Sequence, residues 1–257
     1  MRQWVGWWVG AVLLLSTCAP APTDTPKALV FAMDPALGSP FVYEASPKNY
    51  GGFEVDLGKY IAAKLERPFQ VQAGAWASLP DLVRRKKADV ALSAIEKTTD
   101  ASAPKALQFT GPYYTAYQKL AVHGDDNYTY NLSDLKGKKV GVVMNSVGAL
   151  LLEELNRLKK SQIEIKAYQT PEALFAALSK KEVTATLTER AVASWYAWKI
   201  SNIKLTGDAI TTPLPYVGLV RAEDEELLAA IDEILKKAVK DPEFQQIFDK
   251  WHVSIKR

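Results

Sequence analysis

The residue types on which many catalytic and metal sites depend are sparse or poorly spaced in this chain. His123 and His252 are the only histidines among 257 residues, and they stand far apart in the sequence. A Ser-His-Asp triad or a histidine metal site therefore has little support, and we expect no metal and no cofactor. The segment GVVMNSVG (141–148) also lacks the glycine spacing and the lysine of a phosphate-binding loop. The sequence favours ligand binding over catalysis.

The N-terminus is predicted to be an export signal with an attachment point for lipid. Arg2 precedes the apolar run WVGWWVGAVLLL (4–15), which matches a secretory signal peptide and falls short of the roughly 20 apolar residues of a membrane span. The sequence LSTC (15–18) that follows is similar to a lipobox, so we expect a lipid on Cys18. Signal cleavage a few residues later, without lipid, is the alternative. The Pro- and Thr-rich stretch 19–27 is predicted to be a flexible tether.

Composition excludes several other kinds of partner and bond. Cys18 is the only cysteine, so no internal disulfide can form. The chain has 32 Lys and Arg against 29 Asp and Glu, and one of the basic residues, Arg2, is in the leader. This balance gives no electrostatic reason to expect nucleic acid as a partner.

Strand-like and helix-like segments alternate through the rest of the chain, which predicts an α/β fold with largely parallel sheets. In the segment 53–65, for example, Phe53, Leu57 and Ile61 recur at helical spacing. The first βαβαβ unit has its elements at 28–33, 53–65, 69–73, 79–87 and 89–95. The second unit has its elements at 139–144, 147–160, 163–168, 171–181, 183–188, 189–200 and 202–206.

A strand predicted at 216–221 comes after the second unit is complete. The Pro-rich segment 211–215 before it marks a crossing back to the first unit, and 120–126 is the expected partner of that crossing. Two such crossings form a two-strand hinge with a ligand cleft between two lobes. The predicted domains are 28–121 plus 216–257 for lobe 1 and 122–215 for lobe 2.

Several stretches of the chain stand in a characteristic order and spacing. They are SPFVY (39–43), GGFEVDLGKYIAAKL (51–65), AWASLPDLVRRKKADVALSAI (75–95), LQFTGPYY (107–114), LKGKKVGVVMNSVG (135–148), LFAALSKKEVTATLTERAVASWY (174–196) and FDKWH (248–252). Together they resemble the extracellular solute-binding proteins of polar amino-acid ABC transporters (bacterial solute-binding protein family 3). The resemblance covers about residues 27 to 252 and depends on the order and spacing of the stretches more than on any one of them.

The resemblance implies a periplasmic-binding-protein-like fold, in which two α/β lobes close over a small polar solute. It also implies delivery of that solute to a membrane permease driven by a cytoplasmic ATPase. The expected location is the periplasm or another extracytoplasmic space, with the chain held to a membrane by lipid. We expect a monomer.

Three contacts that the resemblance implies are missing from this chain. The family's arginine, which clamps the ligand carboxylate as a bidentate pair, falls at Ala101 or Ala103. A threonine that also contacts the carboxylate is replaced by Val147, and a stacking aromatic by Gly38. A ligand with the usual α-carboxylate therefore loses its expected partners.

The acidic contacts remain. Glu189 stands where the family uses an aspartate to hold the ligand ammonium, and Glu96 stands where a Ser or Thr normally does so. Only Lys97 or Lys105 is near in sequence to offset two carboxylates. Because a buried carboxylate pair without a cation is unfavourable, we expect a ligand with an amine or another cationic group.

Each candidate ligand contact has a plainer alternative. Glu96 is equally well placed as a surface residue, and Glu189 as an acid in the first turn of the helix 189–200. Ser146 fits both an anion-binding helix start and an ordinary N-cap. Trp76 fits both an aromatic wall and core packing. The full set of predicted ligand-binding residues is Phe41, Tyr43, Trp76, Ser93, Glu96, Ser146 and Glu189.

Two other functions stay open. An exported enzyme on the same scaffold, such as a cyclohexadienyl dehydratase, uses a glutamate of the cleft as general acid, and Glu96 or Glu189 could take that part. Those substrates carry carboxylates, so the missing arginine argues against this function. Alternatively, the fold has lost small-molecule binding and contacts a protein partner.

Overall fold

The computed structural model describes Met1 and residues 26–97 and 103–253. The predicted signal peptide, the lipid attachment at Cys18 and most of the predicted tether 19–27 lie outside the described residues. Within the part of the chain that is described, no helix is long and apolar enough to cross a membrane.

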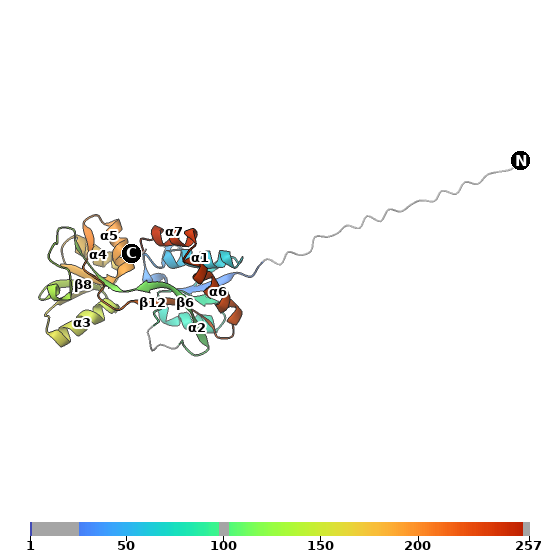
Figure 1. Ribbon diagram of the computed structural model, residues 1–257, viewed down its shortest axis with the longest axis horizontal. Helices are drawn as coiled ribbons and strands as arrows, with labels where there is room; N and C mark the ends of the chain where they lie inside the picture. The colour runs from blue at the N-terminus through green and yellow to red at the C-terminus, as the bar shows by residue number, and fades with distance from the viewer. Residues whose placement is uncertain (2–25, 98–102, 254–257) are drawn as a thin grey trace.

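Lobe 1 is built on a five-stranded sheet in the order β4-β1-β5-β12-β6. β1 is parallel to β4 and β5, whereas β12 is antiparallel to β5 and β6. In Figure 1, α1 and α7 lie on one side of these strands and α2 on the other. The strands are β1 (Leu29–Met33), β4 (Phe69–Ala73), β5 (Val90–Ala91), β6 (Leu107–Ala116) and β12 (Leu214–Arg221), with a hairpin of β2 (Tyr43–Ser46) and β3 (Asn49–Gly51). The helices are α1 (Phe53–Lys64), α2 (Leu79–Arg84), α6 (Glu225–Ala238) and α7 (Pro242–Lys250), with short 3-10 turns η1 (Pro35–Leu37) and η2 (Trp76–Ser78).

Lobe 2 has its own five-stranded sheet in the order β11-β7-β10-β8-β9. α4 and α5 cover one side of it and α3 the other (Figure 1). The strands are β7 (Gln118–His123), β8 (Lys139–Val143), β9 (Glu164–Tyr168), β10 (Ala185–Glu189) and β11 (Ile203–Thr206). The helices are α3 (Val147–Lys159), α4 (Pro171–Ser179) and α5 (Arg190–Lys199), with a 3-10 turn η3 (Leu132–Leu135). The two-lobed α/β prediction is confirmed.

Two chain segments join the lobes side by side. β12 returns to the sheet of lobe 1, where Tyr216 pairs with Tyr114 and Leu214 with Ala116. Next to this pairing, the backbone N–H of Gln118 donates to Thr211 Oγ1 at 3.0 Å. The predicted return of the strand near Tyr216 is confirmed, and the paired segments form the expected two-strand hinge, which crosses the middle of the molecule in Figure 1.

The first crossing lies earlier than expected. We expected the partner segment at 120–126, but β7 is part of the lobe 2 sheet, where Leu120 pairs with Leu187. The chain leaves the first sheet at Ala116 and enters the second at Gln118, so Tyr117 is the crossing. β6 and β7 form an almost continuous extended run, and a change of sheet within such a run leaves no mark on its period-two pattern.

Local chemistry explains how α1 starts against the hinge. Its N-cap is Gly52 with φ 131°, and a Cβ there would lie 2.0 Å from the carbonyl oxygen of Phe41. Only glycine permits both this φ and this approach. The helix then buries Phe53, Leu57 and related side chains in the core of lobe 1.

Candidate functional site

Glu189 is the last residue of β10 and the N-cap of α5, which places its carboxyl group at the junction of the lobes. One oxygen accepts from the backbone N–H of Ala191 at 2.6 Å and of Val192 at 3.3 Å. The other oxygen accepts from the hydroxyl of Tyr114 at 3.0 Å. Because Tyr114 belongs to β6, this last bond links lobe 2 to lobe 1. The side chain is a cap of its own helix and also a contact between the lobes.

Tyr114, whose hydroxyl donates to Glu189, belongs to an aromatic cluster of lobe 1. The rings of Tyr114 and Tyr216 lie 5.5 Å apart between centroids, and Phe41 lies 5.8 Å from Tyr216 and 6.3 Å from Tyr114. Phe53 completes the cluster at 5.9 Å from Tyr114. All four rings are buried. Phe41, a predicted ligand contact, is therefore buried against Tyr114 and Tyr216, away from solvent.

Burial decides the protonation of Glu189. It raises the pKa of this carboxyl group from 4.5 to about 7, while the hydroxyl of Tyr114, the helix N–H groups and the nearby charge of Arg190 lower the pKa. Glu189 therefore changes charge near neutral pH. Tyr216 is affected in turn: burial, followed by the charges of Glu189 and Glu96, raises the pKa of its hydroxyl.

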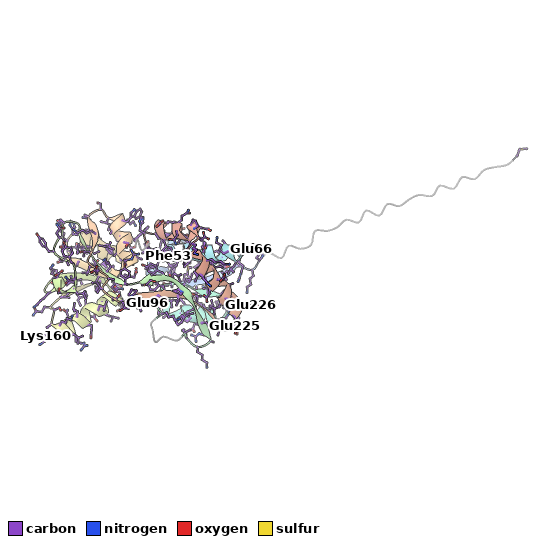
Figure 2. The ribbon with its side chains drawn as sticks, viewed as in Figure 1. Phe53, Glu66, Glu96, Lys160, Glu225 and Glu226 are labelled. Carbon is purple, nitrogen blue, oxygen red and sulfur yellow. The ribbon has the colours of Figure 1, made fainter. Side chains whose placement is uncertain are left out.

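Glu96 lies on the segment that follows β5 and is half-buried. It forms an isolated antiparallel bridge with Tyr216, and the N–H of Lys97 donates to the carbonyl of Pro215 at 2.9 Å. Figure 2 shows Glu96 in the middle of the molecule, beside the strands that join the lobes. Burial raises the pKa of its carboxyl group. Glu96 and Glu189 therefore approach the same tyrosine from different elements.

Trp76 and Ser93 form a network with Asp34 at the ends of the first-sheet strands. The indole N–H of Trp76 donates to the carbonyl of Ser93 at 2.8 Å, and the Ser93 hydroxyl accepts from the N–H of Asp34 at 2.8 Å. The carboxylate of Asp34 accepts from the backbone N–H of Trp76 at 2.8 Å. Trp76 is 49% exposed, so its ring is held by one edge and presents much of its surface to solvent. The role of Trp76 as an aromatic wall of a ligand site stays a prediction.

Ser146 and Tyr43 have local structural roles. Ser146 is the N-cap of α3, with its hydroxyl accepting from the N–H of Ala149 at 3.3 Å. This is the plainer of the two alternatives given for Ser146, and the first helical turn leaves other N–H groups for a ligand. Tyr43 packs edge-on against Trp251 with the ring centroids 6.1 Å apart, so it contacts the C-terminal region.

Three residues of this region were not predicted as contacts. Tyr114 supplies the hydroxyl to Glu189, and Arg190 places a buried guanidinium next to it. Glu54, in the first turn of α1, is fully buried, accepts from the N–H of Ala94 at 2.6 Å and from the hydroxyl of Tyr113, and has one oxygen without a hydrogen-bond partner among the described residues. An acid in a first turn is normally a solvated helix start, so the sequence carried no signal of this burial.

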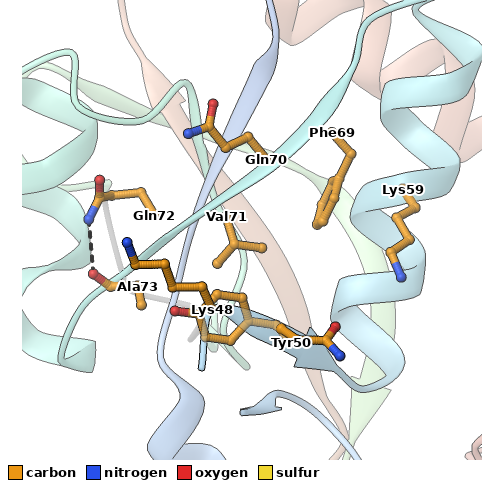
Figure 3. Close-up of a pocket in the computed structure, with 9 residues that line it drawn as sticks. Lys48, Tyr50, Lys59, Phe69, Gln70, Val71, Gln72 and Ala73 are labelled. Atoms are coloured by element: carbon orange, nitrogen blue, oxygen red, sulfur yellow. Dashed lines mark hydrogen bonds between the residues drawn. The ribbon is translucent and has the colours of Figure 1, made fainter. Parts of the chain in front are cut away.

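Two surface cavities lie apart from these residues. One, of about 610 Å³, lies along the edge strand β4 and is lined by Lys48, Tyr50, Lys59 and Phe69 among others (Figure 3). Another, of about 620 Å³, lies on the hinge and is lined by Lys97, Phe109, Pro213 and their neighbours. Neither cavity has Glu189 or Trp76 in its lining. Within residues 26–97 and 103–253, no group of three or more His, Cys, Asp or Glu side chains is arranged to hold a metal ion.

Comparison with known proteins identifies the family. The model of the bacterial extracellular solute-binding proteins, family 3, matches residues 29–254. The chain belongs to this family. It is 25% identical over 214 residues to the L-cystine-binding protein TcyJ of Escherichia coli, covering 82% of this chain and 78% of that protein. Membership of an extracellular solute-binding family places the chain outside the cytoplasm.

Solved structures similar to this chain are also amino-acid-binding proteins. An ancestral arginine-binding protein bound to arginine is 27% identical, with a TM-score of 0.67, over 88% of this chain and 99% of that one. The ancestral amino-acid-binding protein AncCDT-1, a precursor of cyclohexadienyl dehydratase, is 24% identical with a TM-score of 0.68, over 87% of this chain and 95% of that one. The second likeness shows the fold alone.

Proposed function

We propose that this chain binds a small amine-bearing or amino-acid-like solute between its lobes and presents it to the permease of an ABC importer. The family match and the relatives that bind cystine and arginine support a receptor for a polar solute. The observation that carries the proposal is the place of Glu189, a buried carboxyl group of lobe 2 in contact with the hydroxyl of Tyr114 in lobe 1. A solute bound there contacts both lobes and shifts the population toward the closed arrangement.

The charges favour a solute with a cationic group and no α-carboxylate. The segment 93–109 contains no arginine to clamp a carboxylate, and burial raises the pKa of both Glu96 and Glu189. Burial disfavours the ionised form of a carboxyl group, and a cation bound next to the group stabilises that form in place of water. The exposed ring of Trp76 offers a face over which such a cation can lie.

Agmatine and L-arginine test this directly, because they differ only in the α-carboxylate. We expect agmatine and putrescine to raise the melting temperature and to bind more tightly than L-arginine in calorimetry at pH 8. At a concentration of about 100 times Kd, a bound solute stabilises the fold by about 2.7 kcal/mol, which is readily seen in a thermal-shift screen. Tight binding of L-glutamate or L-aspartate contradicts the proposal.

The Glu96→Gln variant tests whether Glu96 is the second acidic contact of the solute. Its side chain is half-buried and makes no structural hydrogen bond among those described, so the fold should be kept. We expect its affinity for agmatine to fall by about tenfold, the effect of losing one hydrogen bond to a charged group. Unchanged affinity would remove Glu96 from the site and leave Glu189 as the acidic contact.

We propose binding without catalysis. The same thermal-shift screen separates this function from two alternatives, an enzyme and a protein that contacts a protein partner. A carboxyl group with its pKa near neutral is also what a general acid requires. However, the dehydratase substrates carry carboxylates, and the segment 93–109 has no arginine to bind one. Slow loss of a compound that binds would indicate an enzyme, and no stabilising compound at all would indicate a protein partner.

We also propose that the receptor is a monomer held at a membrane by lipid on Cys18. The lipobox-like sequence LSTC (15–18) supports this. Cells fed a labelled fatty acid should incorporate the label into the chain, and the Cys18→Ser variant should lose it while remaining exported. Equal labelling of both chains, or of neither, contradicts lipid attachment at this residue.

A further inference from the structure

Arg190 connects three parts of the molecule that are far apart in the sequence. It follows Glu189 directly, is only 9% exposed, and its backbone N–H donates to the carbonyl of Tyr117 at 3.0 Å. Its guanidinium group donates to the carbonyl of Val253 at 2.6 Å and lies 5.7 Å from the centroid of the Tyr117 ring. Tyr117 is the first hinge crossing, and Val253 follows the last helix. One side chain of lobe 2 therefore contacts both.

Residues 251–253, which we call the C-terminal strap, begin in lobe 1. The indole N–H of Trp251 donates to Asp56 of α1 at 2.9 Å. From there the strap reaches α5 of lobe 2: the rings of Trp195 and Trp251 lie 5.3 Å apart, and those of Trp198 and His252 stack at 4.3 Å. In Figure 1, α7 and α5 face each other at this point. The strap is a third connection between the lobes, beside the two hinge strands.

A buried guanidinium group with neutral partners is an unfavourable choice for stability alone. The guanidinium group of Arg190 donates to the backbone carbonyl of Val253, and its Nε has no hydrogen-bond partner among the described residues. Burying a cation without a paired acid costs several kcal/mol unless nearby charge offsets it. The acid that faces it is Glu189: burial raises the pKa of this carboxyl group, and the charge of Arg190 is among the causes that act in the opposite direction. The other titratable groups that interact with Arg190 are Tyr114 and Lys119.

We propose that Arg190 is a positioning residue, which fixes the carboxyl group of Glu189 by tying the start of α5 to the hinge crossing at Tyr117 and to the C-terminal strap. The inference rests on the proposed function in one respect, namely that Glu189 contacts the solute. When the lobes move, the strap and the hinge crossing move with lobe 1, and Arg190 transmits their position to the first turn of α5. The C-terminus thereby controls the geometry of a contact that lies at the lobe junction.

Amide hydrogen exchange measures this without any solute. The N–H groups of Ala191 and Val192 donate to Glu189, so their exchange reports whether the carboxyl group is held. In Arg190→Met we expect both amides to exchange about tenfold faster, the effect of losing one hydrogen bond to a charged group. Arg190→Lys keeps the charge and one donor, so it should restore much of the protection.

Two further variants separate positioning from general stability. Trp198→Ala removes the stacking partner of His252 at a ring that is 58% exposed, and it leaves Arg190 in place. It should speed exchange at the same two amides by a smaller factor and increase the radius of gyration in solution scattering. Tyr128→Ala, at an 82% exposed ring of the same lobe, is the matched control and should change neither.

The outcomes decide the inference independently of solute binding. Unchanged exchange at Ala191 and Val192 in Arg190→Met overturns it, as does an equal acceleration at all amides of lobe 2, which is the signature of a merely structural residue. If Arg190→Met does not fold, the exchange rates of the Ala191 and Val192 amides in Arg190→Lys and Trp198→Ala test the inference instead. If no compound in the thermal-shift screen binds, the proposed function fails while the exchange result still stands. Where agmatine binds, Arg190→Met should weaken it through faster dissociation.

Discussion

Replacing Glu189 by alanine is expected to weaken the binding of agmatine by at least tenfold and to destabilise the fold. The affinity falls because a hydrogen bond to a charged group contributes about 1.5–3 kcal/mol. The fold is destabilised because the same carboxyl group caps α5 and accepts from Tyr114 across the lobes. Loss of the cap costs about 1 kcal/mol and a stranded buried hydroxyl about as much again, so the free energy of unfolding should fall by about 2 kcal/mol. Calorimetry and urea unfolding measure the two effects separately.

The Glu189→Gln variant distinguishes the two roles. Its amide oxygen can still accept from the first turn of α5, so stability should stay close to that of the original chain. Its charge is lost, so the affinity for agmatine at pH 8 should fall almost as far as in the alanine variant. An affinity that is unchanged in both variants excludes Glu189 from the site, whatever happens to stability.

Stability is expected to fall as the pH rises from about 4.5 to above 7, and Glu54 is a main cause. Its pKa is raised from 4.5 to about 7, chiefly by complete burial, with hydrogen bonds from Tyr113 and Ala94 acting in the opposite direction. Below pH 4.5 the carboxyl group is protonated in both the folded and the unfolded chain. Between pH 4.5 and 7 only the folded chain keeps the proton, so the free energy of unfolding decreases with pH. The shift corresponds to about 3 kcal/mol, and Glu189 acts in the same direction.

Comparison with Glu54→Gln isolates this contribution. The amide has the shape of the protonated acid and cannot ionise. The difference in unfolding free energy, variant minus original, should therefore rise by about 3 kcal/mol between pH 4.5 and pH 8. Tyr113→Phe removes a hydrogen bond that lowers the pKa of Glu54, so its loss of stability should extend to higher pH. A difference that is constant with pH would show that Glu54 titrates normally in the folded chain.

Much of the fold follows from local sequence patterns. The helix predicted at 53–65 is α1 (Phe53–Lys64), and the strand predicted at 69–73 is β4 (Phe69–Ala73). Apolar residues recur at helical spacing in α1, and half-buried and exposed residues alternate in β4, so the sequence of each segment sets its period. The hairpin of β2 and β3 was not predicted, because its short strands are mostly exposed and show no alternation.

The candidate site was predictable only where a residue type stands out in sequence. Glu189 could be singled out because the resembled family has an acid at this position, and Glu96 because the family normally has a Ser or Thr there. Both lie close to Tyr216. Tyr114 and Arg190 could not, because a tyrosine in a strand and an arginine in a helix are ordinary. Their importance comes from partners 75 and 63 residues away in the chain.

The sequence by itself determined the class of the protein: alternating strands and helices, a crossing marked by prolines and an order of motifs that names the family. These properties are local, or depend only on the order of segments along the chain, so they can be recognised without the tertiary structure. The tertiary structure decided which groups meet. It brought the hydroxyl of Tyr114 to Glu189, enclosed Glu54 completely and carried the C-terminal strap onto α5. Desolvation and hydrogen bonding depend on neighbours in space, so the charge states at the lobe junction exist only once both sheets are assembled.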